Sequence, residues 1–141
     1  MTQLGARARI VSKCRLLVVD DHALSRKAIL AVLRVRGYEC AGVGTAGDAV
    51  CGIESFAPHV VILEWAFRDP RQCGLGLAEK LRHRSLELAR PLSIVVVSHA
   101  EQPMAFRVRE GVDAYFTKPV APHVLVAVVD ELAAQCSRET A

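Results

Sequence analysis

The strongest constraint on the fold is a short apolar run that ends in one acid. Val60 to Leu63 are four successive aliphatic residues, and Glu64 follows them directly. Four residues are too few for a helix, and a run without polar positions is typical of a strand that is buried on both faces. A carboxylate at the end of such a strand is partly cut off from water, so it needs a partner or has a function.

Similar apolar runs recur along the chain and alternate with segments of helical spacing. The strand patterns cover residues 15–21, 39–45, 60–63, 94–97 and 112–117. The helical patterns cover residues 23–36, 47–56, 74–89, 101–110 and 121–136. Five alternations of strand and helix predict an α/β domain with a parallel sheet that helices cover on both faces.

The length and composition are those of one soluble globular domain. At 141 residues, with 52% hydrophobic and 23% charged residues, the chain can bury the core of one domain. We expect a flexible lead-in over 1–13, the domain over 14–136 and a tail over 137–141. The lead-in lacks the apolar segment of a signal peptide, and no run is long enough to span a membrane.

The charge of the chain limits the classes of partner that we expect, and its cysteines indicate the cellular compartment. The formal net charge is +3 without a continuous basic tract, which argues against direct contact with nucleic acid. The five cysteines are scattered and form no CxxC pair. They indicate reduced thiols in a cytoplasmic protein.

Polar side chains stand at the ends of four of the predicted strands. They are Asp20 and Asp21, Glu64, Ser98 and Lys118. In open parallel sheets, ligands bind beyond the carboxyl ends of the strands, where the winding direction reverses. Carboxylates are suited to Mg²⁺, whereas lysine and hydroxyl groups bind phosphate oxygens. The sequence therefore predicts a crevice for Mg²⁺, held by the three acids, and for a phosphoryl group.

At this point the chain resembles the receiver domain of bacterial two-component response regulators, over residues 14–136. Asp20-Asp21 match the metal-binding acidic pair of the family, and Lys118-Pro119 match its lysine with the following proline, often a cis peptide. Ser98 matches the switch hydroxyl and Tyr115 the switch aromatic. The resemblance implies a flavodoxin-like (βα)5 three-layer sandwich, with a five-stranded parallel sheet in the order 2-1-3-4-5. It also implies two-component (phosphorelay) signalling, with a histidine kinase or an output protein as partner.

The main departure from the family pattern is Glu64, which stands where the family has its phosphoacceptor aspartate. The extra methylene moves the carboxylate about a bond length forward. In phosphoryl transfer, an error of about 1 Å in the position of the attacking oxygen can cost on the order of 100-fold in rate. From there Glu64 could reach Lys118 or Ser98. We therefore hypothesise a single-domain, atypical receiver that needs no phosphorylation and signals by protein contacts. We expect no enzymatic turnover beyond weak autophosphorylation and autodephosphorylation.

Three further departures favour the same hypothesis, and several alternatives stay open. By comparison with the family pattern, Arg68 stands in place of the proline four residues after the acceptor, and His99 in place of the small residue after the switch hydroxyl. The segment 98–118 is about two residues shorter than in the family. The main alternative is a conventional receiver that accepts a phosphoryl group on Glu64, with Mg²⁺ and a histidine kinase. A phosphoryl group on Asp69 is disfavoured, because Asp69 lies in a Pro-containing loop. A nucleotide site is disfavoured, because the chain lacks a GxGxxG motif.

The last predicted helix has no polar face over more than one turn, because every residue from Val124 to Val129 is apolar. An exposed apolar stripe usually marks an interface. The resemblance implies dimers through helix 4, strand 5 and helix 5. We predict a homodimer or partner contact that includes Val124, Val126 and Ala127. Coverage of this helix by the N-terminal arm is the alternative.

Overall fold

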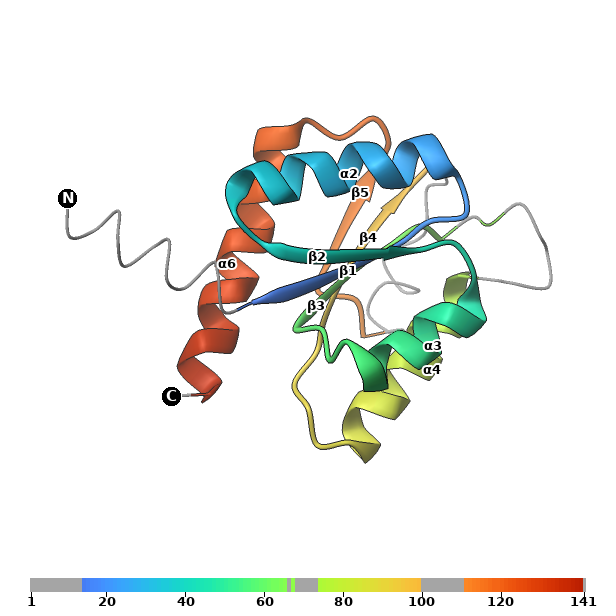
Figure 1. Ribbon diagram of the computed structural model, residues 1–141, viewed down its shortest axis with the longest axis vertical. Coiled ribbons are helices and arrows are strands. Elements are labelled where there is room, and N and C mark those ends of the chain that lie inside the picture. The colour runs from blue at the N-terminus through green and yellow to red at the C-terminus, as the bar shows by residue number, and fades with distance from the viewer. Residues whose placement is uncertain (1–13, 66, 68–73, 100–110, 141) are drawn as a thin grey trace.

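The protein is a three-layer α/β sandwich built on a five-stranded parallel sheet (Figure 1). The computed structural model describes residues 14–65, 67, 74–99 and 111–140. Its strands are β1 (Arg15–Val19), β2 (Glu39–Val43), β3 (Val60–Leu63), β4 (Ser93–Ser98) and β5 (Ala114–Thr117). They pair in the order β2-β1-β3-β4-β5, and every pair is parallel. The predicted fold class and strand order are confirmed.

Helices cover both faces of this sheet. They are α2 (Ala23–Arg36), α3 (Ala46–Ser55), α4 (Gly74–Glu87) and α6 (Pro122–Thr140). Figure 1 shows α2 and α6 on one face, and α3 with α4 on the other. The predicted helix over 101–110 lies outside the described residues. None of the helices in the described part of the chain is both long and apolar enough to cross a membrane.

The start of α3 and the end of α6 differ from the bounds that the sequence predicts. Thr45 was predicted to end β2, but it is the N-cap of α3, and its Oγ1 accepts a hydrogen bond from the N–H of Asp48 at 3.1 Å. The last helix was predicted to end at Cys136, but α6 continues to Thr140. No glycine or proline follows Cys136 to stop that helix.

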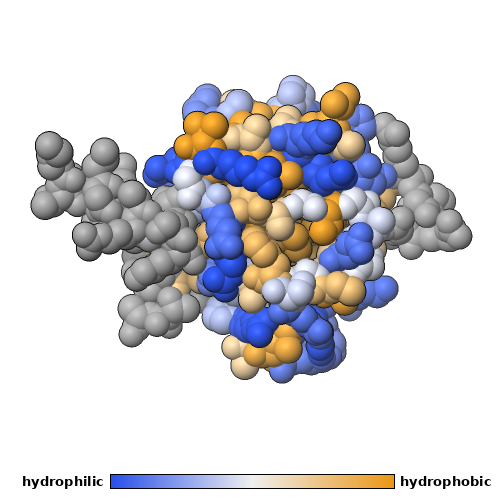
Figure 2. All heavy atoms as spheres, viewed as in Figure 1, coloured by the Kyte–Doolittle hydropathy of each residue, from blue (hydrophilic) through white to orange (hydrophobic). Residues whose placement is uncertain are grey.

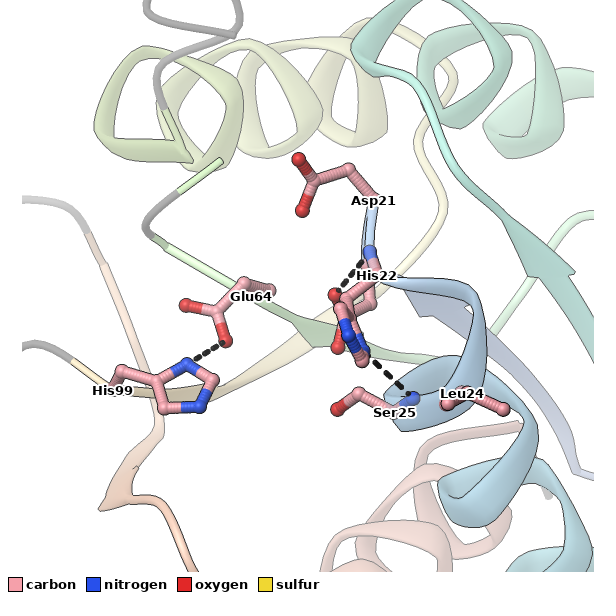
Figure 3. Close-up of a pocket in the computed structure, with 7 residues that line it drawn as sticks. Asp21, His22, Leu24, Ser25, Glu64 and His99 are labelled. Carbon is pink, nitrogen blue, oxygen red and sulfur yellow. Dashed lines mark hydrogen bonds and ion pairs between the residues drawn. The ribbon is translucent and has the colours of Figure 1, made fainter. Parts of the chain in front are cut away.

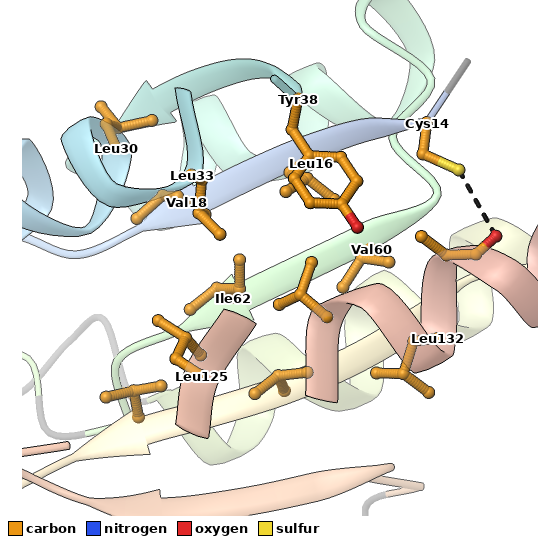
Figure 4. Close-up of a cluster of buried hydrophobic side chains, with 14 residues drawn as sticks. Cys14, Leu16, Val18, Leu30, Leu33, Tyr38, Val60, Ile62, Leu125 and Leu132 are labelled. Carbon is orange, nitrogen blue, oxygen red and sulfur yellow. Dashed lines mark hydrogen bonds between the residues drawn. The ribbon is translucent and has the colours of Figure 1, made fainter. Parts of the chain in front are cut away.

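The core is divided by the sheet into two apolar layers, as strand alternation requires. From β1, Leu16 and Val18 join the layer beneath α2 and α6, which Figure 4 shows, and Leu17 joins the layer beneath α3 and α4. All four residues of β3 are buried. This confirms that the run before Glu64 is a central strand covered on both faces.

Two polar contacts fix α2 against the rest of the α2 and α6 layer. Gly37 closes α2 with a φ of 106° in the left-handed region, which glycine adopts without strain. Directly after it, the Tyr38 hydroxyl donates to Asp130 Oδ1 at 2.5 Å. Arg36 binds Asp130 Oδ2 on α6 at 3.1 Å. Helix α2 is therefore held to α6 by side chains as well as by the core.

The stability of the fold is expected to fall in mild acid because of His59. Its Nδ1 accepts a hydrogen bond from the backbone N–H of Arg15 at 3.0 Å, which links the starts of β3 and β1. Burial, together with the charge of Arg15, lowers the pKa of His59 below its ordinary value of about 6.5. The unfolded chain therefore takes up a proton more readily than the folded protein, so stability is full above pH 6.5 and is lost as the pH falls through the lowered pKa.

Urea unfolding at pH 7.5 and pH 5 measures this effect. The difference in unfolding free energy between the two pH values should shrink in His59→Asn. It should be unchanged in His123→Asn, because His123 is exposed on the surface. An undiminished difference in His59→Asn would contradict the assignment.

Candidate functional site

A polar pocket opens at the carboxyl edge of the sheet, where the sequence placed the crevice (Figure 3). Its volume is about 520 Å³, and its lining residues are Asp20, Asp21, His22, Leu24, Ser25, Glu64 and His99. The acids come from the ends of β1 and β3, and the serine comes from the first turn of α2. That turn is fixed by its N-cap, because His22 Nδ1 accepts a hydrogen bond from the N–H of Ser25 at 3.2 Å.

The ammonium of Lys118 joins three of the residues that line this pocket. Lys118 Nζ lies 2.7 Å from Glu64 Oε2 and 2.9 Å from Asp20 Oδ2. It also donates to Ser25 Oγ at 2.8 Å. A lysine ammonium has three N–H donors, and each of them has an acceptor here. The predicted contact between Glu64 and Lys118 is confirmed.

Burial strengthens the Coulomb attraction within these ion pairs, because little water screens them. The side chains of Lys118 and Glu64 are only 11% and 3% exposed, and that of Asp20 is 2% exposed. Burial by itself lowers the pKa of Lys118, but the hydrogen bonds and charges of Glu64 and Asp20 outweigh it and raise the pKa. Lys118 therefore stays charged at neutral pH, and its contribution to stability is lost only as the pH rises through this raised, alkaline pKa.

Ser98 and His99 stand at the end of β4, beside the pocket. Ser98 is fully buried, and its carbonyl oxygen accepts a hydrogen bond from the N–H of Lys118 at 2.7 Å. The Lys118-Pro119 bond is cis, as the resemblance implied. His99 Nδ1 lies 3.7 Å from Glu64 Oε2, and its side chain is 72% exposed. His99 therefore lines the pocket from its exposed side.

The three acids predicted to hold Mg²⁺ do not gather into a metal site. Within the described residues, no three His, Cys, Asp or Glu side chains are arranged to hold a metal ion. The Lys118 ammonium binds both Asp20 and Glu64, so it supplies the positive charge that a cation would supply. Asp21 lines the same pocket but contributes to no such cluster. Metal binding by these acids stays a prediction.

Two aromatic residues meet behind the pocket. The rings of Trp65 and Tyr115 pack edge to face, with centroids 5.9 Å apart and planes at 63°. Trp65 is 3% exposed, and the Tyr115 hydroxyl oxygen is buried. Trp65 Nε1 is buried without a hydrogen-bond acceptor among the described residues. The predicted switch aromatic, which is half-buried, thus packs on a residue to which the sequence reasoning gave no role.

The structure describes only part of the remaining predictions. On α6, Val124 is 37% exposed, Ala127 is exposed and Val126 is half-buried, so the predicted contact residues are partly accessible. Arg68 and Asp69 lie outside the described residues. The homodimer itself stays a prediction.

The fold and the pocket define a class: a doubly wound α/β protein with acids, a buried serine and a lysine at the carboxyl edge of its sheet. Residues 16–130 match the response regulator receiver domain, and the chain belongs to this family.

Curated relatives and solved structures agree with this membership. The chain is 31% identical over 112 residues to the phosphate regulon transcriptional regulatory protein PhoB of Pseudomonas aeruginosa, covering 79% of this chain and 48% of that protein. It is 29% identical over 115 residues to the DNA-binding response regulator MtrA of Mycobacterium leprae, covering 82% and 49%. The chain therefore spans about half the length of these curated relatives.

Among solved structures, a CheY-like response regulator receiver domain protein from Methanospirillum hungatei JF-1 has a TM-score of 0.79 and 26% identity, covering 89% of this chain and 98% of that chain. The signal receiver domain of a putative Luxo repressor protein from Vibrio parahaemolyticus shares the fold, with a TM-score of 0.76 at 20% identity, covering 90% of this chain and 95% of that one.

Proposed function

We propose that this chain is an atypical receiver whose signalling state does not depend on phosphorylation. The observation that carries the proposal is the saturated ammonium of Lys118, which binds Glu64, Asp20 and Ser25 at once. In a phosphorylated site, a lysine at this place would bind the phosphoryl oxygens. Here a carboxylate of the chain itself already supplies the negative charge.

The length of the glutamate side chain supports the same conclusion. Phosphoryl transfer needs the attacking oxygen in line with the leaving group and within near-attack distance. Glu64 Oε2 is instead engaged by the Lys118 ammonium at 2.7 Å. A phosphodonor would have to break this buried ion pair before the carboxylate could attack, and breaking such a pair costs several kcal/mol, about 3–5 when one partner is removed.

The partner of such a receiver is another signalling protein, which reads the surface of the domain. A histidine kinase or an output protein of a two-component pathway is the class that the family suggests. The sequence led us to expect a domain that works alone, whereas this chain spans about half the length of its curated relatives. In either arrangement Glu64 would hold the domain in one state rather than switch it.

Incubation with acetyl phosphate and Mg²⁺, followed by intact-mass measurement, tests the proposal. We expect no stoichiometric phosphoryl adduct on the wild-type chain. Glu64→Asp shortens the side chain by one methylene and restores the acceptor of the family, so we expect it to gain an adduct. A wild-type adduct that disappears in Glu64→Gln would instead establish a conventional phosphoaccepting receiver that uses Glu64 and Mg²⁺.

A further inference from the structure

Three cysteines of the described chain belong to the layer that α2 and α6 form with the sheet. Cys14 directly precedes β1, Cys40 lies in β2, and Cys136 lies near the end of α6. Cys14 and Cys136 are buried, and Cys40 is half-buried. Figure 2 shows hydrophobic and hydrophilic residues mixed over the surface of α2 and β2, and Cys14 lies in the core beneath this surface. Two buried thiols therefore stand at the ends of two elements of one layer.

A hydrogen bond places the Cys14 thiol against α6. The thiol donates to the carbonyl oxygen of Ala133 at 3.5 Å, as Figure 4 shows, and so joins residues that are 119 positions apart in the chain. Ala133 is fully buried in the same core cluster as Cys14. The Cys14 sulfur therefore lies on the side of α6 that faces the sheet.

Cys136 lies on that same side of α6, nearly one turn further along. The buried residues of the helix follow one another at helical spacing, and they are Leu125, Val129, Leu132, Ala133 and Cys136. In an α-helix, the Cβ atom of residue i+3 lies about 4 Å from the carbonyl oxygen of residue i. Because the Cys14 sulfur is 3.5 Å from the Ala133 oxygen, it lies within about 8 Å of the Cys136 Cβ atom. A disulfide places the two Cβ atoms about 3.8 Å apart, which a shift of a few ångströms at one end would achieve.

Both cysteines stand where the fold opens most easily. Cys14 precedes the first residue of β1, and Cys136 is in the last turns of α6, which ends at Thr140. The ends of strands and helices open at a small part of the free energy of global unfolding. Leu125 and Val129 lie further back in the core and would keep the rest of α6 on the sheet during such an opening. The two sulfur atoms can therefore meet without loss of the fold.

We propose that Cys14 and Cys136 form a reversible disulfide when the protein meets a hydroperoxide. One thiolate attacks the peroxide, the O–O bond breaks, and the sulfur becomes a sulfenic acid while an alcohol leaves (water, in the case of hydrogen peroxide). The second thiolate attacks the sulfenic sulfur, so that the S–S bond forms, the S–O bond breaks and water leaves. Two electrons pass from the two sulfurs to the peroxide, and the two thiol protons go to the alcohol and the water.

The disulfide would fasten the end of α6 to the start of β1, at the edge of the sheet opposite the pocket. Burial raises the pKa of the Cys14 thiol above its ordinary value, so the closed state protects this sulfur and the reaction proceeds through the opened ends. The bond would form whatever the state of Glu64. It would thus give the domain a covalent input that is separate from the pocket.

Treatment of the full chain with hydrogen peroxide, followed by intact-mass measurement, tests the proposal. We expect a monomer that has lost two hydrogen atoms, and peptide mapping should join Cys14 to Cys136. Dithiothreitol should restore the reduced mass. The oxidised monomer should also melt about 5–10 °C above the reduced one, because the disulfide closes a loop over most of the domain.

Alanine variants locate the reacting thiols. Cys14→Ala and Cys136→Ala should each lose both the disulfide and the rise in melting temperature. The rise is measured against the reduced form of the same variant, so a packing defect in the variant does not affect it. Cys51→Ala is the matched control and should behave as the wild type does, because Cys51 is exposed on α3.

Several results would overturn the proposal. These are a wild-type monomer whose mass does not fall, a disulfide between Cys14 and Cys40, and sulfinic acids in place of a disulfide. Retention of the lower mass in Cys136→Ala would also contradict it. A covalent dimer that Cys51→Ala abolishes, with Cys14 and Cys136 still open to N-ethylmaleimide after unfolding, would show that only the exposed thiol reacts.

Discussion

Lys118→Met should lower the free energy of unfolding by about 3–5 kcal/mol at neutral pH, because it leaves two buried carboxylates without a cation. Glu64 and Asp20 lose their ion pairs with the lysine at 2.7 and 2.9 Å, and Ser25 loses its donor. The methionine has nearly the volume of the lysine stem, so packing changes little. Urea unfolding followed by circular dichroism measures the loss.

Neutralising the acids separates the charge effect from other causes. Adding Glu64→Gln and Asp20→Asn to Lys118→Met should recover most of the lost stability, because the unpaired negative charges are then removed. Lys80→Met is the matched control, since Lys80 is exposed on α4, and it should change stability by less than about 0.5 kcal/mol. A loss below about 1 kcal/mol for Lys118→Met would mean that the pocket admits water and that the ion pairs are weak.

Trp65→Ala should cost about 3–5 kcal/mol of stability, the range for removing a large buried aromatic side chain. It would open a cavity behind the pocket and remove the edge-to-face contact with Tyr115. Trp65→Phe should cost much less. It keeps part of the ring and removes an N–H that has no acceptor in the described part of the chain, and an unsatisfied buried donor costs about 1–3 kcal/mol.

Thermal and urea unfolding of the two Trp65 variants, side by side, provide the comparison. Equal losses for the phenylalanine and the alanine variants would contradict the explanation. They would mean that the indole N–H makes a hydrogen bond that stabilises the fold.

The sheet and the position of the pocket were predictable because they follow from short-range patterns. A run as short and as apolar as Val60 to Leu63 favours a strand covered on both faces, and parallel strands bring their polar ends to one edge. The contact of Glu64 with Lys118 was expected from this geometry together with the family resemblance and the length of the glutamate side chain, with Ser98 as the other candidate partner.

The parts that were not predictable depend on side-chain direction. Ser25 lies inside a helix and has no sequence signal, and it reaches Lys118 only because of how α2 packs on the sheet. The contact of Trp65 with Tyr115 depends on two rotamers at the ends of different strands. The Mg²⁺ prediction counted three acids at one edge, but counting could not show that the ammonium of Lys118 binds two of them.

The position of Trp65 gives the domain an optical reporter. The chain contains a single tryptophan, which follows Glu64 directly in the sequence and is buried. Its emission spectrum depends on the polarity and charge around one indole ring, with no second fluorophore of its kind to obscure the signal. Any event that rearranges the carboxylates or admits water behind them can therefore be followed in real time, on the unlabelled protein, by stopped-flow spectroscopy.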